Sequence, residues 1–148
     1  MLLTIQLKLQ LLDSEDSVAI FETQALFSEA CNAMVPFVQE HRCWNQVALH
    51  HHCYYKIREM MPQLGSQMIC NGLRKVCSSY RALGIPRSEP VKAIQFRQRS
   101  SIHYCARTMT IREDWVSLFT IRGRIRCKFK LGRRQRAYLA QGKPRRRS

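Results

Sequence analysis

The chain has 148 residues, of which 45% are hydrophobic, so it is long enough and apolar enough to bury a core. Its 25 Lys and Arg residues against 10 Asp and Glu give a net charge of +15, and the whole excess lies in residues 84–148, with 18 basic and three acidic residues. This asymmetry favours a polyanion-binding protein over a small-molecule enzyme, and the sequence has no run of roughly 20 apolar residues that would span a membrane.

The N-terminal third predicts a strand followed by a helix. Residues 2–11 alternate apolar and polar, which is typical of a half-buried strand and unlike the continuous apolar stretch of a signal peptide. Residues 13–16, Asp-Ser-Glu-Asp, supply a capping oxygen and negative charge where a helix begins. Apolar residues follow at helical spacing as far as Val38, and we expect Pro36 to kink or end this helix.

Two further helices are expected before residue 84. The first fits Asn45 to Met61, with Asn45 as its cap and a proline as its stop. The second begins with Ser66 as its cap and ends at Gly84. Its apolar residues recur at intervals of three and four: Ile69, Leu73, Val76, Tyr80 and Leu83.

Beyond residue 84 the pattern is typical of β-structure. Strands are expected at 91–96, 107–112, 116–121 and 124–131, with Gly123 at a turn. A single N-terminal strand cannot satisfy its backbone hydrogen-bonding groups, so it should pair with strands that follow the helices. The sequence therefore predicts an α+β fold in which helices interrupt a β part, with boundaries near residues 12 and 84.

Basic and apolar residues alternate from Arg122 to Lys130. In a strand, one face of this segment carries four cations: Arg124, Arg126, Lys128 and Lys130. Neighbours on that face lie about 6.6 Å apart, similar to successive phosphates of a nucleic acid, and their mutual repulsion is relieved by a bound anion. Further cations extend the patch: Arg133, Arg134, Arg136, Lys143 and Arg145 to Arg147. We expect these residues, with Arg122, to bind nucleic-acid backbone without reading its sequence.

The sequence also allows other interpretations. The charged run is also compatible with a merely solvated strand and tail, and most aromatic residues in this half are expected to pack in a core. The seven cysteines are odd in number and scattered, which favours free thiols. Residues 50–53, His-His-His-Cys, lack the ligand spacing of zinc sites, and Glu113 and Asp114 fall in a predicted turn. We therefore expect no catalytic residue, no metal and no cofactor.

Several short motifs occur in an order that resembles one known family. They are Ser-Gln-Met (66–68), Ser-Ser-Tyr-Arg-Ala-Leu (78–83), Ser-Ile-His-Tyr-Cys-Ala-Arg-Thr-Met-Thr-Ile (101–111), Val-Ser-Leu-Phe-Thr (116–120), Gly-Arg (123–124), and Leu-Gly (131–132) with Gln-Arg-Ala-Tyr-Leu (135–139). In this order they resemble the N-terminal portion of TnpB proteins, transposon-encoded RNA-guided DNA endonucleases of the IS200/IS605 group. These proteins are related to type V CRISPR effectors and have long been described as transposases.

The resemblance implies an incomplete wedge-type β-barrel, residues 1–11 and 84–148, with a three-helix recognition lobe, residues 12–83, inserted after the first strand. Together these parts would hold a guide RNA and target DNA. The resemblance also implies six candidates near the target-adjacent motif: Ser66, Gln67, Cys70, Tyr104, Arg107 and Thr108. The nuclease residues of the family would lie beyond Ser148, so the expectation is a truncated, non-catalytic chain.

The expected partners are thus guide RNA and target DNA, with no membrane and no small-molecule substrate, in a prokaryotic cytoplasm near the nucleoid. Two rival interpretations stay open. One is a stand-alone basic RNA-binding protein of the ribosomal type. The other is a Cys/His metal-dependent enzyme, which stoichiometric zinc after purification would favour.

Overall fold

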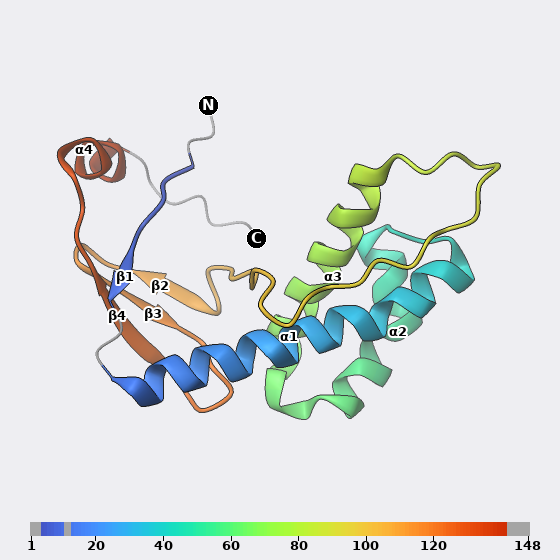
Figure 1. The fold of residues 1–148 in the computed structure, drawn as a ribbon, viewed down its shortest axis with the longest axis horizontal. Coiled ribbons are helices and arrows are strands. Elements are labelled where there is room, and N and C mark those ends of the chain that lie inside the picture. The colour runs from blue at the N-terminus through green and yellow to red at the C-terminus, as the bar shows by residue number, and fades with distance from the viewer. Residues whose placement is uncertain (1–3, 11–12, 142–148) are drawn as a thin grey trace.

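The computed structural model describes residues 4–10 and 13–141. In chain order the elements are β1 (Leu9–Gln10), α1 (Ser14–His41), α2 (Gln46–Met60), the 3-10 helix η1 (Pro62–Leu64), α3 (Gly65–Leu83), β2 (Met109–Ile111), β3 (Trp115–Leu118), β4 (Ile125–Phe129) and α4 (Arg133–Gln141). Within the described residues the fold is α+β, as the sequence predicts. The sheet and α4 lie at one end, α2 and α3 at the other, and α1 runs along both (Figure 1).

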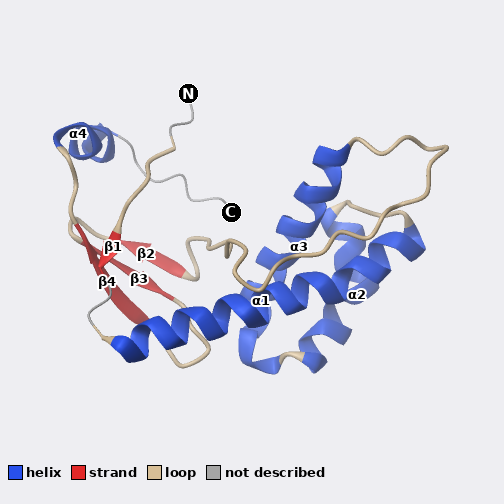
Figure 2. Ribbon diagram, in the orientation of Figure 1, coloured by secondary structure: helices blue, strands red, loops and turns tan. Residues whose placement is uncertain are grey.

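The four strands form an open antiparallel sheet in the order β1-β4-β3-β2 (Figure 2). Of the described residues 4–10, only Leu9 and Gln10 form the N-terminal strand, which is shorter than predicted. It pairs with a strand that follows the helices, as predicted, with Leu9 opposite Phe129. Among the described residues the sheet is not closed into a barrel, because β1 and β2 are its two edges. Its inner face is apolar and packs with Ile20 of α1 and with the half-buried Tyr104. The buried residues of this face are Val116, Leu118, Cys127 and Phe129.

The first helix begins as predicted and continues past Pro36, where the sequence allowed either a kink or an end. The side chain of Asp13 caps α1 by accepting a hydrogen bond from the backbone N–H of Glu15 at 3.0 Å. Pro36 does not end the helix, which continues to His41. Proline removes one helical hydrogen bond, but its ring is exposed here while the neighbouring Val35 is buried in the core, and that burial keeps the helix intact.

The second and third helices follow the prediction except at one cap. Asn45 caps α2 by accepting from Ala48 N–H at 3.1 Å. Ser66 is not the cap of α3, because η1 leads directly into α3 at Gly65 and places Ser66 inside the first turn. Gly84 ends α3 with φ +56°, a left-handed conformation that glycine adopts without strain.

Residues 91–96 do not form the predicted strand. Side chains from two helices take the place of a strand partner. Asn32 accepts from Phe96 N–H at 2.7 Å and donates to its carbonyl at 2.9 Å, while the Tyr80 hydroxyl bonds Lys92 O at 2.8 Å and Ile94 N at 3.2 Å. The buried Phe96 joins the helical core, so the segment is an extended strap across the helices.

A buried lysine secures the next part of this strap. Lys75 of α3 is buried. Its Nζ atom lies 5.7 Å from the ring centroid of Phe27 and 5.4 Å from that of Phe96. The ammonium group donates hydrogen bonds to Ser100 Oγ at 3.1 Å and to the Ser101 carbonyl. Burial lowers the pKa of this ammonium group. The ammonium group contacts neutral oxygens and aromatic rings, and these contacts hold the strap in place without an ion pair.

Thr23 joins α1 to the turn between β3 and β4. Its hydroxyl is buried, donates to Ala19 O at 2.7 Å and accepts from Ile121 N–H at 2.9 Å. We expect Thr23→Val, which has nearly the same shape, to lower the free energy of unfolding by about 1–3 kcal/mol, because the Ile121 N–H loses its acceptor. Thr23→Ser keeps the hydroxyl and should cost less. Chemical denaturation of both variants measures the difference, and an equal loss would contradict the assigned hydrogen bond.

None of the helices in residues 13–141 is both long enough and apolar enough to cross a membrane.

Candidate nucleic-acid interface

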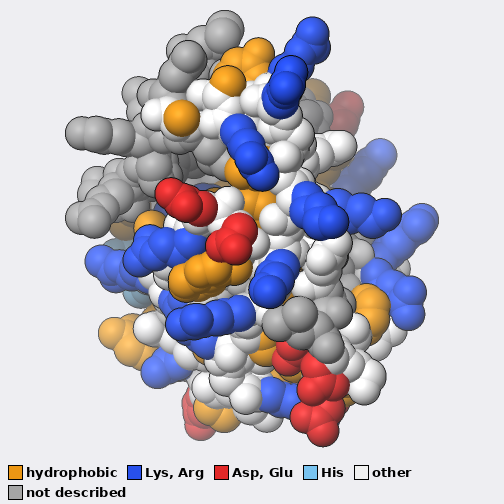
Figure 3. Space-filling view, turned by 90° about the vertical axis from the view of Figure 1, so that its left-hand side faces the viewer, with side chains coloured by type: hydrophobic (Ala, Val, Ile, Leu, Met, Phe, Trp, Pro, Cys, Tyr) orange, Lys and Arg blue, Asp and Glu red, His pale blue; other side chains and the backbone are white. Residues whose placement is uncertain are grey.

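The outer face of β4 carries the predicted cations. Buried and exposed side chains alternate along β4. Cys127 and Phe129 are buried on the inner face, and the basic side chains next to them in sequence are exposed on the outer face. The exposed cations are Arg124, Arg126, Lys128 and Lys130. Figure 3 looks onto this end of the molecule, where Lys and Arg side chains are spread over the face.

Neighbouring strands complete this outer face. Trp115 lies opposite Lys128 in the β3–β4 register, so the two side chains share the outer side. The guanidinium carbon of Arg126 lies 4.4 Å from the centroid of the Trp115 ring. This cation–π contact holds Arg126 against the sheet and presents a flat cationic surface beside the lysines.

Arg124 is held by neutral oxygens. Its guanidinium donates to Thr110 Oγ1 at 3.3 Å, to Ser117 Oγ at 3.2 Å and to the Arg107 carbonyl at 2.8 Å. None of these acceptors carries a negative charge, so the positive charge of Arg124 is positioned but not neutralised. That arrangement suits contact with an incoming anion.

Arg122 differs from the other cations of this segment. It lies in the turn before β4 and makes a two-pronged ion pair with Glu22 of α1, at 2.8 Å from Nε and 2.7 Å from Nη2. The hydrogen bond from Arg122 lowers the pKa of the Glu22 carboxyl. A phosphate would have to compete with this carboxylate for Arg122, whereas no described acid pairs with the cations of β4.

The acidic turn between β2 and β3 lies beside the cations. Glu113 and Asp114, with Lys128, Lys130 and Arg136, line a pocket of about 230 Å³. The position of these acids in a turn agrees with the prediction, but their proximity to the lysines was not foreseen. They lower the local positive potential, but neither makes an ion pair with Lys128 or Lys130 among the described residues, so both lysines stay available to a polyanion.

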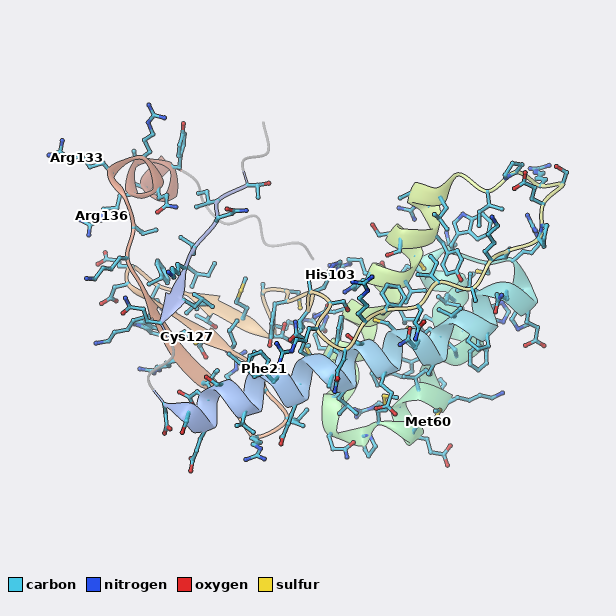
Figure 4. The ribbon with its side chains drawn as sticks, in the orientation of Figure 1. Phe21, Met60, His103, Cys127, Arg133 and Arg136 are labelled. Carbon is cyan, nitrogen blue, oxygen red and sulfur yellow. The ribbon has the colours of Figure 1, made fainter. Side chains whose placement is uncertain are left out.

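The basic segment after β4 is a helix, α4, which the sequence pattern does not predict. Three of its cations, Arg133, Arg134 and Arg136, are exposed on α4, and Figure 4 shows Arg133 and Arg136 pointing away from the rest of the molecule. Gln135 fixes the helix by accepting from Gly132 N–H at 2.9 Å and donating to Gln6 O at 2.7 Å. The sequence signal for the start of this helix was a glutamine three residues after a glycine, because a glutamine at that position can accept a hydrogen bond from the backbone N–H where the helix begins. Lys143 and Arg145 to Arg147 lie outside the described residues.

Of the six residues suggested for target-motif contact, all but Tyr104 lie around the start of α3. Arg107 donates to Gln67 Oε1 at 3.3 Å, which joins the loop before β2 to the first turn of α3. Ser66 and Arg107 are exposed there, while Thr108 is buried. The Tyr104 hydroxyl donates to Phe119 O at 2.8 Å, and burial raises its pKa to about 12. The Tyr104 side chain therefore packs in the protein interior, and its hydroxyl is already hydrogen-bonded to the backbone.

Asn71 and Cys105 belong to the same cluster and were not singled out from the sequence. Asn71 is buried, with its amide nitrogen 3.5 Å from Thr108 Oγ1. The same Thr108 oxygen accepts from Cys105 N–H at 2.9 Å. Burial tends to raise the pKa of the Cys105 thiol, but hydrogen bonds from Thr108 and from the Arg107 backbone outweigh it and lower the pKa. Cys70, the remaining candidate, is half-buried, and burial raises its thiol pKa.

Within residues 4–10 and 13–141, no three His, Cys, Asp or Glu side chains gather closely enough to hold a metal ion. Comparisons of this chain with protein-family models, with curated proteins and with solved structures find no match.

Proposed function

We propose that this chain binds the phosphate backbone of nucleic acids through the outer face of its sheet. The observation that carries this proposal is the exposed row of cations on β4, with Arg126 stacked on Trp115 and Arg124 held by neutral oxygens. A folded chain gains little from holding like charges on one sheet face unless an anion neutralises them. The row is therefore better explained by a polyanionic ligand than by solvation alone.

The interface we propose extends from β4 onto α4. Its members are Arg124, Arg126, Lys128, Lys130, Arg133, Arg134 and Arg136. Arg122 joins only if a phosphate displaces Glu22. Contacts of this kind fix the position of a nucleic acid without selecting its sequence.

We further propose that the chain is the N-terminal, nucleic-acid-binding part of a TnpB-like RNA-guided endonuclease, with guide RNA and target DNA as partners. Three points support this: the order of the sequence motifs, the insertion of α1, α2 and α3 between β1 and β2, and the proximity of Gln67 to Arg107. In this proposal residues 1–11 and 84–148 are the wedge and residues 12–83 the recognition lobe. The proposed role is binding alone, because the motifs that carry the resemblance contain no acidic residue.

Equilibrium binding across a range of salt concentrations tests the proposal. With fluorescently labelled duplex DNA and structured RNA, the logarithm of the association constant should fall against the logarithm of salt with a slope near −5, if about six phosphates are contacted. Both ligands should bind, and neither should be cleaved with Mg²⁺ present. A flat dependence would contradict backbone binding, binding of structured RNA alone would favour the ribosomal type, and cleavage would contradict a binding-only role.

A further inference from the structure

A second pocket lies at the other end of α1, where that helix leads into α2. Its volume is about 590 Å³, and it is a shallow depression that is largely open to solvent. The residues that line it carry two guanidinium groups, two imidazoles, an indole, an amide and a thiol: His41, Arg42, Cys43, Trp44, Asn45, His52 and Arg81. The 28 residues of α1 place this pocket about 42 Å along the helix from the end that meets the sheet, so it is separate from the proposed interface.

The charge of this wall favours an anion. Arg42 ends α1 and donates to the carbonyl oxygens of Pro86 and Glu89, so no carboxylate neutralises it in the part of the chain that is described. Arg81 is exposed on the last turn of α3 and makes no ion pair among those residues. The Glu40 carboxylate is 3.8 Å from Nε2 of His41 but does not line the pocket. The described wall therefore carries cations and no acid.

The same wall offers flat ring surfaces. The imidazoles of His41 and His52 are stacked, with centroids 3.7 Å apart and an interplanar angle of 7°. Trp44 is stacked on Tyr80 at 6.4 Å, which holds the indole in place. A planar heterocycle gains stacking energy against such rings.

Asn45 adds a directional donor. Its side-chain oxygen is occupied as the cap of α2, accepting from Ala48 N–H at 3.1 Å. Its amide nitrogen has no acceptor among the contacts of the described residues. An amide N–H beside a guanidinium is a suitable pair of donors for phosphate oxygens.

We propose that this pocket binds a nucleoside phosphate. Its base lies against the imidazole and indole rings, and its phosphate is held by Arg81 and the Asn45 amide. A free nucleotide and the 5′-phosphorylated end of an RNA present the same chemistry. This site does not depend on the proposed sheet interface, and either can fail without the other.

Tryptophan fluorescence tests the site directly, because the chain has two tryptophans, Trp44 in this pocket and Trp115 on the sheet. In Trp115→Phe, titration with 5′-AMP should change Trp44 emission saturably. Adenosine and inorganic phosphate should each bind at least about 10-fold more weakly, since each supplies half of the contacts. No saturable response to 5′-AMP would overturn the proposal, and so would equal binding of inorganic phosphate or of adenosine.

A variant of the phosphate-binding residue sharpens the test. Arg81→Gln in the same background should weaken 5′-AMP binding by about 10-fold or more, because it removes a charged donor. Arg87→Gln, an exposed arginine that does not line the pocket, is the matched control and should leave binding unchanged. Unchanged affinity in Arg81→Gln, with thermal stability intact, would overturn the assignment. Arg81→Gln should also leave salt-dependent duplex binding unchanged, which separates this site from the sheet interface.

The source of the ligand can be resolved with the same fluorescence signal. A 5′-phosphorylated RNA trinucleotide that binds at least about 10-fold more tightly than 5′-AMP identifies an RNA end as the ligand, because further nucleotides then contribute contacts. Equal affinity identifies a free nucleotide. Both results support a nucleoside-phosphate site, whereas an RNA trinucleotide that binds equally well without its 5′-phosphate would contradict it.

Discussion

Replacing Arg126, Lys128 and Lys130 together by glutamine should weaken duplex DNA binding by about 100-fold at moderate salt. The slope of log affinity against log salt should become shallower by about 2.7, because three phosphate contacts are lost. Glutamine is polar and uncharged, and the three substitutions leave the buried inner face of β4 untouched, so the fold should be retained. Fluorescence anisotropy at several salt concentrations measures both quantities.

A matched variant controls for the loss of overall charge. Lys56 on α2 is exposed, and so are Arg87 and Lys92 in the segment that follows α3. Their replacement by glutamine removes the same number of charges. This control should weaken binding by less than about 10-fold, through the general field of the protein alone. Equal weakening by the two triple variants would mean that net charge, and not the outer sheet face, determines binding.

Phe27→Ala should lower the free energy of unfolding by about 3–5 kcal/mol. Phe27 is fully buried between α1 and α3 at 0% exposure, and truncation leaves a cavity where the helices pack most closely. The closeness of this packing is evident at Gly72, where an added Cβ would lie 3.2 Å from Met34 Cε and 3.7 Å from the Phe27 ring. Urea denaturation followed by circular dichroism gives the stability of the variant.

Phe21 provides a control of the same residue type in the same helix. It is 50% exposed, and its ring lies 5.0 Å from the guanidinium carbon of Arg99. Phe21→Ala should cost about 1 kcal/mol, since it loses a cation–π contact and little buried area. Similar losses for the two variants would show that the α1–α3 contact is not the main core of the helical part.

The sequence predicted the elements whose signal is local. Three helices were predicted because caps and helical spacing act within a few residues. They are the helices capped by Asp13 and by Asn45 and the helix that ends at Gly84. The cations of β4 were placed on one face because alternation in a strand leaves no other choice. The pairing of the N-terminal strand followed from the need to satisfy its backbone groups.

The errors arose where distant residues decide the outcome. Residues 91–96 have the composition of a strand, but Asn32 and Tyr80 satisfy their backbone groups instead. The pairing of Arg122 with Glu22 joins residues 100 positions apart in sequence, which no local pattern indicates. The pocket at the junction of α1 and α2 is likewise assembled from distant segments, so no local pattern around His41 or His52 indicates it.

Lysine footprinting tests the central claim most directly. The protein is acetylated with and without a saturating nucleic acid, and mass spectrometry measures the modification of each lysine. We expect Lys128 and Lys130 on β4 to be protected by about 10-fold or more, while the exposed Lys56 on α2 and Lys92 in the segment that follows α3 react at the same rate in both samples. Protection of Lys56 and Lys92 with continued reaction of Lys128 and Lys130 would contradict binding at the outer sheet face.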